Sequence, residues 1–458
     1  MVLNIACLPN KAHLRFWLLA PTASKCTEFQ ILSISEFEMP ELSPICLNTP
    51  DEGTATVLTG KQRTTAVCIV VENLPVPLDR RVWNEARALR DAGYAVSVIC
   101  PKGKNAHTAG YELLEGIHIY RHASWEASGA IGYVLEYGMA LAAELYLILK
   151  VFYRTKFRIL QGCNPPDTIF LLALLLRPFG VRFVFDHHDL SPELFEVKFG
   201  RRGQLFAALT RLAEKCSFRA ASVSIATNES FKDVAITRGG KLPEHVFVVR
   251  NCPDLTKLGP TVVRTNPRHG RPLQVVYVGF MARQDGLDLL LESIDYIIKQ
   301  TGRRDVSFVL VGGGTMLPEL RSIVNRKELN PFVTFTGQVP YDEVVHYLSN
   351  SDIGVAPDPK TVMNDNSTMI KIFEYMAFGL PVVLFDLKEG RRSAGSAALY
   401  ARPNDPIDFA NQITSLLDSV ELRKKLGAVG RKRIEEGLNW ENEKANLLRA
   451  YSMALQVN

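Results

Sequence analysis

The feature that most constrains this chain is a regular alternation of short apolar, β-branched runs with amphipathic stretches. The first cycle contains the apolar run Thr65–Val71, an amphipathic stretch over Val82–Ala92 and a second apolar run, Ala95–Cys100. A continuous apolar run is typical of a parallel strand that is buried on both faces. Strand, helix and strand in this order form a right-handed βαβ unit, so the chain predicts parallel sheets covered by helices.

The alternation occurs twice. It extends to about residue 255 and starts again after a stretch rich in Pro, Gly, Arg and Thr. We therefore predict an α/β chain with two doubly wound domains, 63–255 and 273–435, joined by a linker over 256–272. Residues 1–62 show no sustained period and are predicted to form a disordered leader. Ligands of such sheets bind beyond the carboxyl ends of the strands, so one site is expected between the two domains.

Composition narrows the class of protein further. The 458 residues are 47% apolar and 22% charged, which excludes wholesale disorder. A net charge of +5 suits an anionic substrate or membrane surface but is too weak to indicate a nucleic-acid binder. The eight cysteines are scattered without a C-x-x-C pair, which argues against a disulfide scaffold or zinc ribbon and favours a reducing cytoplasm.

The strongest candidate for an anion site lies near residue 367. Ser367 and Thr368 are predicted to be N-caps of a helix that begins at Met369. Backbone N–H groups and the helix dipole at such a start attract anions, and Lys371 would add positive charge one turn later. Glu374, further along the same helix, has a carboxylate that can accept hydrogen bonds from both hydroxyls of a ribose. An ordinary capped helix with a solvated Glu explains the spacing equally well.

Two glycine-containing turns follow strands in the second half. Gly279 would let the backbone approach a phosphate, and Arg283 would pair with that phosphate; a plain βα turn with a surface Arg is the alternative. The run Val311–Gly314, which includes Gly313, resembles a dinucleotide-binding turn. However, the third glycine of G-x-G-x-x-G falls on Leu317, so a nicotinamide oxidoreductase is disfavoured.

In the first half, Asp186 and His188 follow a predicted strand at its carboxyl end. A histidine there can hydrogen-bond an acceptor hydroxyl or a departing phosphate. The cluster around it offers too few ligands to favour a metal, and the chain has no D-x-D that would signal a bound divalent ion. Asn73, Arg80 and Arg81 lie near the end of the first strand and the start of the next helix, where one arginine is expected to face the ligand; solvated charges are the alternative.

Taken together, four stretches resemble signatures of glycosyltransferase family 4, whose members have the two-domain GT-B fold. The stretches are Pro77–Tyr94, Phe185–Glu193, Val311–Gly314 and Glu374–Val383. Each is modest alone, but their order and spacing are specific, and the resemblance covers about residues 65–455. The subgroup is similar to enzymes that build bacterial surface polysaccharides on lipid carriers.

The resemblance implies a donor-binding second domain. Glu374 matches the second Glu of the family's E-x₇-E motif, which binds the donor ribose, whereas the first Glu falls on Asn366. The family's diphosphate-binding Arg and Lys, in G-R-L-x-x-x-K-G, fall on Phe280 and Asp285, although the two glycines keep their spacing at Gly279 and Gly286. Our candidates for the missing positive charge are Arg283 and Lys371.

The resemblance also implies the reaction. His188 is similar to the first-domain histidine that meets the transferred sugar, and the final helix, 436–458, is expected to cross back to the first domain. We expect a retaining transfer from a nucleoside-diphosphate sugar to an acceptor hydroxyl, in polysaccharide or glycolipid synthesis and with no cofactor or essential metal. A GT-B sugar-nucleotide epimerase and a non-catalytic sugar-nucleotide-binding protein are the alternatives.

Two stretches favour contact with an anionic membrane, so a cytoplasmic protein that is peripheral on the inner face of the plasma membrane is expected. Residues Tyr133–Arg154 are strongly apolar with interspersed charges, and residues 198–219 carry six cations against one acid. A buried core helix is the alternative for the first stretch.

Overall fold

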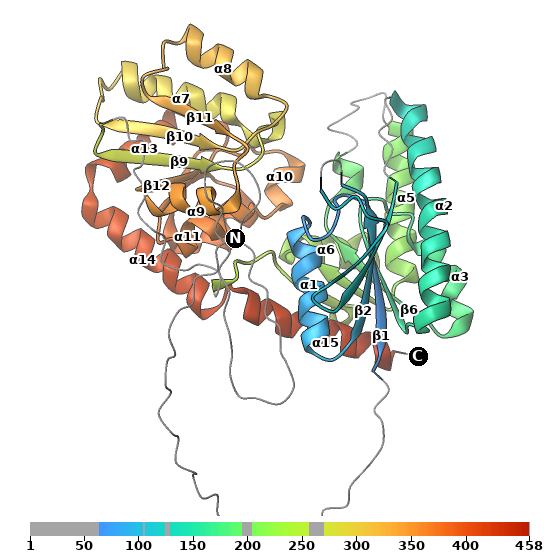
Figure 1. Cartoon of the computed structure of the whole chain (residues 1–458). Helices are drawn as coiled ribbons and strands as arrows, with labels where there is room; N and C mark the ends of the chain where they lie inside the picture. Colours follow the sequence, from blue (N-terminus) through green and yellow to red (C-terminus); the bar gives the residue numbers. More distant parts are fainter. Residues whose placement is uncertain (1–63, 104–105, 124–128, 195–203, 256–269, 458) are drawn as a thin grey trace, which may run out of the picture. The chain divides into compact units, whose positions relative to one another are not determined.

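The computed structural model describes residues 64–103, 106–123, 129–194, 204–255 and 270–457. The predicted leader and most of the predicted linker lie outside these residues. The chain from Gln62 to Asn458 forms one compact unit, and it contains two separate sheets. Helices cover both sheets (Figure 1). The predicted fold class, two doubly wound parallel-sheet domains, is confirmed.

The first sheet has eight strands in the order β3-β4-β2-β1-β5-β6-β7-β8. All neighbours are parallel except β3 and β4. The strands are β1 (Ala66–Val71), β2 (Ala95–Pro101), β3 (Tyr111–Leu114), β4 (Ile117–His122), β5 (Ile159–Cys163), β6 (Arg182–His187), β7 (Val223–Ala226) and β8 (Val246–Val248). The helices are α1 (Arg80–Asp91), α2 (Gly129–Thr155), α3 (Phe170–Leu176), α5 (Gln204–Ala220) and α6 (Glu229–Thr237).

Helix α3 begins at Phe170, so Pro165 and Pro166 lie in the loop between β5 and α3. The antiparallel edge strand β3 was not predicted, because Tyr111–Leu114 is short and has no buried residue. Strand β3 is joined to β4 by the two-residue turn Glu115-Gly116. Both turn residues have positive φ, as a hairpin turn of this length requires.

The second sheet has six parallel strands in the order β11-β10-β9-β12-β13-β14. They are β9 (Leu273–Val278), β10 (Val306–Val311), β11 (Val333–Gly337), β12 (Ile353–Ala356), β13 (Val382–Phe385) and β14 (Ala398–Ala401). The helices are α7 (Leu287–Lys299), α8 (Leu317–Arg326), α9 (Tyr341–Ser349), α10 (Val362–Asn366), α11 (Ile370–Ala377), α12 (Lys388–Ala394), α13 (Pro406–Asp418) and α14 (Val420–Glu436).

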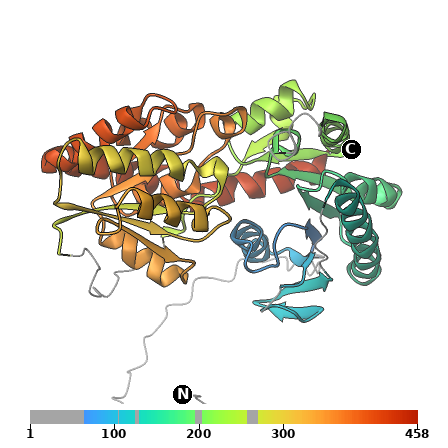
Figure 2. The ribbon, with the colours of Figure 1, turned by 90° about the horizontal axis from the view of Figure 1, so that it is seen from above.

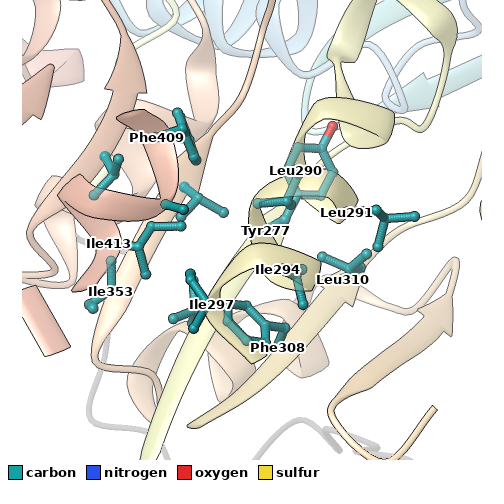
Figure 3. Close-up of a cluster of buried hydrophobic side chains, with 14 of the residues drawn as sticks. Tyr277, Leu290, Leu291, Ile294, Ile297, Phe308, Leu310, Ile353, Phe409 and Ile413 are labelled. Carbon is teal, nitrogen blue, oxygen red and sulfur yellow. The ribbon is translucent and has the colours of Figure 1, made fainter. Parts of the chain in front are cut away.

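The core of the second domain forms where two helices pack on this sheet. Ile294 and Ile297 of α7 and Ile413 of α13 gather with Phe308 of β10 and Ile353 of β12 (Figure 3). All five side chains are at most 1% exposed. This packing covers one face of β10 and β12, and the loops that follow β9, β10 and β12 carry candidate donor residues.

The final helix, α15 (Trp440–Gln456), packs on the first sheet although it follows the second domain in the chain. Figures 1 and 2 show it beside the first domain, and Leu447 and Tyr451 are fully buried in that domain's core. The Tyr451 hydroxyl donates to Gln161 Oε1 on β5 at 2.5 Å. The chain therefore returns from the second domain to the first, and α15 is part of the core of the first domain. No described helix is both long enough and apolar enough to cross a membrane.

Replacing Tyr451 with Ala should strongly destabilise the protein. The change opens a cavity in a fully buried place and unpairs Gln161 Oε1, at a cost of about 3–5 kcal/mol. Urea unfolding measures the difference. Tyr153→Ala is the control, because that tyrosine is 80% exposed and its loss should change stability by less than about 0.5 kcal/mol. Equal effects of the two changes would show that α15 adds nothing to the first domain.

Candidate functional site

A buried ion pair lies at the carboxyl end of the first sheet. Arg81 in the first turn of α1 binds both carboxylate oxygens of Asp186, at 2.7 Å through Nη2 and at 3.2 Å through Nε. The helix starts here because Asp79 caps it, accepting the Val82 N–H at 3.1 Å. Arg81 also donates to the Val249 carbonyl at 2.7 Å. Arg81 and Asp186, predicted to face the acceptor, are both buried.

His188 is attached to this pair. Its Nε2 lies 2.6 Å from Asp186 Oδ2 and 3.0 Å from Arg81 Nε. Asp186 can only accept and the Arg81 Nε–H can only donate, so both cannot hydrogen-bond Nε2 at once; the shorter contact, with the carboxylate, favours a proton on Nε2 and leaves Nδ1 as the ring nitrogen that this pair does not engage. Burial disfavours the charged ring, but Asp186 overcomes it and raises the pKa of His188. The His188 backbone N–H donates to Asn164 Oδ1 at 2.6 Å, so the loop is fixed as well.

Three positioning residues of this network were missed by sequence reasoning: Glu85, Gln161 and Asn164. Gln161 Nε2 bridges Glu85 at 2.7 Å and Asp186 at 3.1 Å. Burial first, and Asp186 second, raise the pKa of Glu85 to about 7. Two features of the sequence could have indicated this network: the polar residue Gln161 within the apolar strand β5, and the acidic residue Glu85 on the buried face of α1. Buried polar groups of this kind need partners, which makes them informative.

The second constellation surrounds Lys371 on α11. Its ammonium lies 2.8 Å from Asp358 Oδ1 and 4.0 Å from Asp285 Oδ1, and it faces the ring of Tyr277 at 4.8 Å. Burial opposes the charge, but Asp358 and Asp285 raise the pKa of Lys371. Asp285 occupies the position where the family pattern places a Lys. The cation therefore comes from α11 here, and two carboxylates already neutralise it.

The predicted N-caps of α11 are wrong. The helix starts at Ile370 with Met369 as N-cap and without a side-chain cap. Ser367 instead donates to the Met363 carbonyl at 2.8 Å, because the preceding residues form the short helix α10 and Ser367 ends it. The hydroxyl of Thr368 is buried and has no hydrogen-bond partner within the described part of the chain. The start of α11 is thus left uncapped by any side chain, with a buried unpaired hydroxyl beside it.

Asn366 lies at the end of α10. Its side-chain amide donates to the Val362 carbonyl at 2.8 Å, and its own carbonyl accepts from Asn228 of the first domain at 2.9 Å. The amide thus binds its own helix.

The glycines of the two predicted turns serve close backbone contacts. A Cβ on Gly312 would lie 2.0 Å from the Gly279 carbonyl oxygen, and one on Gly314 would lie 2.4 Å from the Met281 carbonyl oxygen. The Met281 N–H donates to the Gly313 carbonyl at 2.9 Å. The two turns therefore approach each other. Gly286 has a φ of +67°, and a Cβ there would lie 2.1 Å from the Pro357 carbonyl oxygen.

One side chain links the predicted donor and acceptor residues. The Arg80 guanidinium lies 3.9 Å from Glu374 Oε1 and 4.2 Å from the ring centre of Tyr341, both in the second domain. Arg80 is 65% exposed and Glu374 is 15% exposed. Burial raises the pKa of Glu374, although Arg80 and Lys371 oppose the shift. The pair joins α1 of one domain to α11 of the other.

Two further candidates are exposed. Arg283 lies in a short 3₁₀ turn and makes no hydrogen bond or ion pair with another described residue. Asn73 lies in the loop after β1. The described residues thus place His188, Asp186 and Arg81 together on the first domain. They place Met369, Lys371, Glu374 and the Gly279 turn together on the second.

Two family models match the chain. Residues 78–257 match the model described as Glycosyltransferase Family 4, and residues 272–419 match the one described as Glycosyl transferases group 1. The two matches follow the two sheets in order.

Curated relatives match part of the chain. An alpha-D-kanosaminyltransferase of Streptomyces kanamyceticus is 26% identical over 34% of this chain and 39% of its own length. An amylovoran biosynthesis glycosyltransferase of Erwinia amylovora is 25% identical over 31% of this chain and 37% of its own length. The chain therefore spans about two fifths of the length of these relatives.

Solved structures match almost the whole described fold. The sucrose-phosphate synthase of Thermosynechococcus elongatus has a TM-score of 0.69 at 17% identity, covering 86% of this chain and 100% of its own. Anabaena HepE in complex with UDP and glucose has a TM-score of 0.64 at 16% identity, covering 85% of this chain and 99% of its own. At these identities the similarity concerns the fold.

Proposed function

Because this chain belongs to glycosyltransferase family 4 and has the GT-B fold, we propose that it transfers a sugar from a nucleoside-diphosphate sugar to an acceptor hydroxyl. The observation that carries the proposal is the contact between Arg80 and Glu374. In this contact a residue expected to lie on the acceptor side, Arg80, is next to a residue expected to bind the donor, Glu374. The UDP and glucose bound to the similar HepE support a nucleotide donor.

The diphosphate binds at the start of α11. The N–H groups there carry no side-chain cap, and the adjacent Thr368 hydroxyl is unpaired. A helix start of this kind attracts a phosphate through its N–H groups and dipole. Lys371 contributes less net charge than predicted, because Asp358 and Asp285 neutralise it; it joins α11 to the Gly279 turn. Arg283, which is exposed and makes no ion pair with another described residue, is a cation that remains available to the diphosphate.

Glu374 binds the donor ribose. Its side chain is 15% exposed, and its only ion pair with a described residue is the 3.9 Å contact with Arg80. That contact is longer than a hydrogen bond, so two ribose hydroxyls can replace it at little cost. Arg80 is then released from Glu374 and remains stacked on Tyr341.

The first domain supplies the group that meets the transferred sugar. Asp186 holds Nε2 of His188, so Nδ1 is directed to the ligand. When the bond from the anomeric carbon to the diphosphate oxygen breaks, negative charge grows on the leaving phosphate, and the N–H dipoles of α11 and Arg283 stabilise it. The acceptor hydroxyl attacks from the same face and gives its proton to the leaving phosphate oxygen, so configuration is retained. No metal ion at the diphosphate enters this scheme.

The acceptor is a polysaccharide precursor or glycolipid, as expected from the resemblance and supported by the amylovoran relative. An epimerase would convert the donor with no acceptor present, and a binding protein would leave it unchanged. Analysis of products with donor alone and with acceptors separates these alternatives from transfer.

Membrane contact through one face of the first domain is part of the proposal. The adjacent helices α2, α3 and α5 (Figure 1) expose a set of large apolar side chains: Tyr146, Leu149, Tyr153, Leu171, Leu174, Leu175, Leu209 and Leu212. Lys150 lies over the ring of Tyr146, and Lys156 lies over that of Tyr153. Apolar side chains with adjacent cations suit an anionic lipid surface. Helix α2 is buried on the face that carries Ile148 and Val151, as the alternative of a core helix predicts, but its opposite face is exposed.

Replacing Glu374 with Ala should weaken nucleotide binding. The nucleoside diphosphate used is the one that raises the melting temperature most in a screen of UDP, GDP, ADP and CDP. Loss of two hydrogen bonds to a carboxylate should cost about 2 kcal/mol or more, which is ~30-fold in affinity. Calorimetric titration without divalent cations measures it.

Two controls accompany that titration. Glu436→Ala removes a surface carboxylate of α14 and should leave binding unchanged. Arg80→Ala frees Glu374 and should not weaken binding. Wild-type affinity in Glu374→Ala would remove its ribose role, and a strict need for Mg²⁺ would contradict the metal-free scheme.

Replacing His188 with Ala should lower turnover by about 10²-fold or more while nucleotide affinity stays near wild type. Turnover should fall while affinity does not, because His188 contacts the transferred sugar and not the nucleotide. Steady-state kinetics with the nucleotide titration measure both quantities. His118→Ala is the matched control, because that ring hydrogen-bonds Tyr111 in the edge hairpin, away from the Asp186 pair. Wild-type turnover in His188→Ala would exclude the ring from the site.

Replacing Leu175 and Leu212 with Glu should abolish binding to phosphatidylglycerol vesicles in a sedimentation assay, because it adds negative charge to the apolar face. Val420→Glu changes an exposed apolar residue of the second domain and should bind like wild type. If wild-type protein binds neither phosphatidylglycerol nor phosphatidylcholine vesicles, the membrane proposal is wrong.

A further inference from the structure

A second polar cluster lies in the first domain, away from His188. Glu72 follows β1, His122 is the last residue of β4, and Glu144 lies on α2. One ligand atom of each lies within 4.8 Å of the other two, and Glu72 Oε2 is 3.0 Å from His122 Nε2. Because β1 and β4 both run parallel to β2, which lies between them, the cluster lies at the carboxyl edge of the sheet.

Glu144 is the residue that needs an explanation. Its side chain is fully buried, and among the residues that the structure describes neither carboxylate oxygen has a hydrogen-bond partner. Burial, and next the charge of Glu72, raise the pKa of Glu144. Two acids beside one histidine leave an excess of negative charge, and a buried unpaired carboxylate costs several kcal/mol. A cation that binds all three groups would remove that cost.

His122 is oriented to bind such a cation. Its Nδ1 lies 3.1 Å from the Ala123 carbonyl oxygen. A carbonyl oxygen only accepts, so Nδ1 carries a proton. Nε2 faces the Glu72 carboxylate at 3.0 Å, so it also carries a proton in the metal-free protein, and a cation bound there would displace that proton. A carbonyl partner on the far nitrogen is the arrangement that fixes metal-binding histidines.

We propose that Glu72, His122 and Glu144 form a binding site for one divalent transition-metal ion, best matched by Zn²⁺. One imidazole and two carboxylates are ligands that Zn²⁺ accepts, and three protein ligands leave a fourth position open. Mg²⁺ fits less well, because it prefers six oxygen ligands and seldom binds imidazole. Two carboxylates balance the charge of the ion.

The other group of potential ligands in the described residues does not compete. Cys163, Asp186 and His188 also lie close together, but there the Arg81 guanidinium already binds Asp186. In the Glu72 cluster the partner of the carboxylate is the His122 ring, which can release its Nε2 proton when a metal binds. The ion would join the loop after β1 to α2. That loop leads to Arg80, so the metal is a structural support of the first domain and is separate from the diphosphate.

The test measures metal content and affinity in the full chain. Protein stripped with a chelator and then dialysed against Zn²⁺ should hold one ion per chain by mass spectrometry. Co²⁺ in its place should give visible absorption bands of a low-symmetry site. Glu144→Gln keeps the shape of the side chain and should weaken Zn²⁺ binding by about tenfold or more. Zn²⁺ should raise the melting temperature of wild type and not of Glu144→Gln.

The matched controls are Glu112→Gln and His118→Gln on the neighbouring strands β3 and β4, which should bind Zn²⁺ like wild type. The proposal is overturned if wild-type protein binds no Zn²⁺, or if Glu144→Gln binds it equally well. In the first case Glu72 and Glu144 share a proton instead, and Glu144→Gln is then neutral or stabilising. None of these readouts involves sugar transfer, so they stand apart from the proposed activity.

Discussion

Arg81 is the cation on which the polar end of the first sheet depends. Asp186, Glu85 and Gln161 are all fully buried there, and a buried carboxylate without a partner is too costly to keep. Arg81 binds Asp186 with two nitrogens and lies 3.2 Å from Glu85. Burial would raise the pKa of Asp186, but Arg81 and His188 hold it well below its usual range. His188 can therefore be oriented by a carboxylate that stays ionised.

In the second domain, too, buried charges are paired, but the cation and the carboxylates come from different positions. The family pattern places positive charge in the turn after the first strand of this domain, where the chain has Phe280 and Asp285. Lys371 supplies a cation from the neighbouring helix and is matched by Asp358 and Asp285. A buried and paired Lys adds rigidity more than net charge. Donor binding then depends on the helix start, on Glu374 and on the exposed Arg283.

The sequence predicted the fold class and the elements that carry the site, because buried parallel strands have an unmistakable apolar pattern. It failed at Ser367 and Thr368, since the short helix α10 competes for Ser367 and no periodicity marks so short a helix. The partners of Lys371 and the orphan Glu144 were not predictable, because their contacts join segments far apart in the sequence.

The most direct test of the account is a crystal structure with the best-binding nucleoside diphosphate. We expect phosphate oxygens within hydrogen-bond distance of the first N–H groups of α11, and both ribose hydroxyls on Glu374 in place of Arg80. A nucleotide bound elsewhere, with the contact between Arg80 and Glu374 intact, would contradict it.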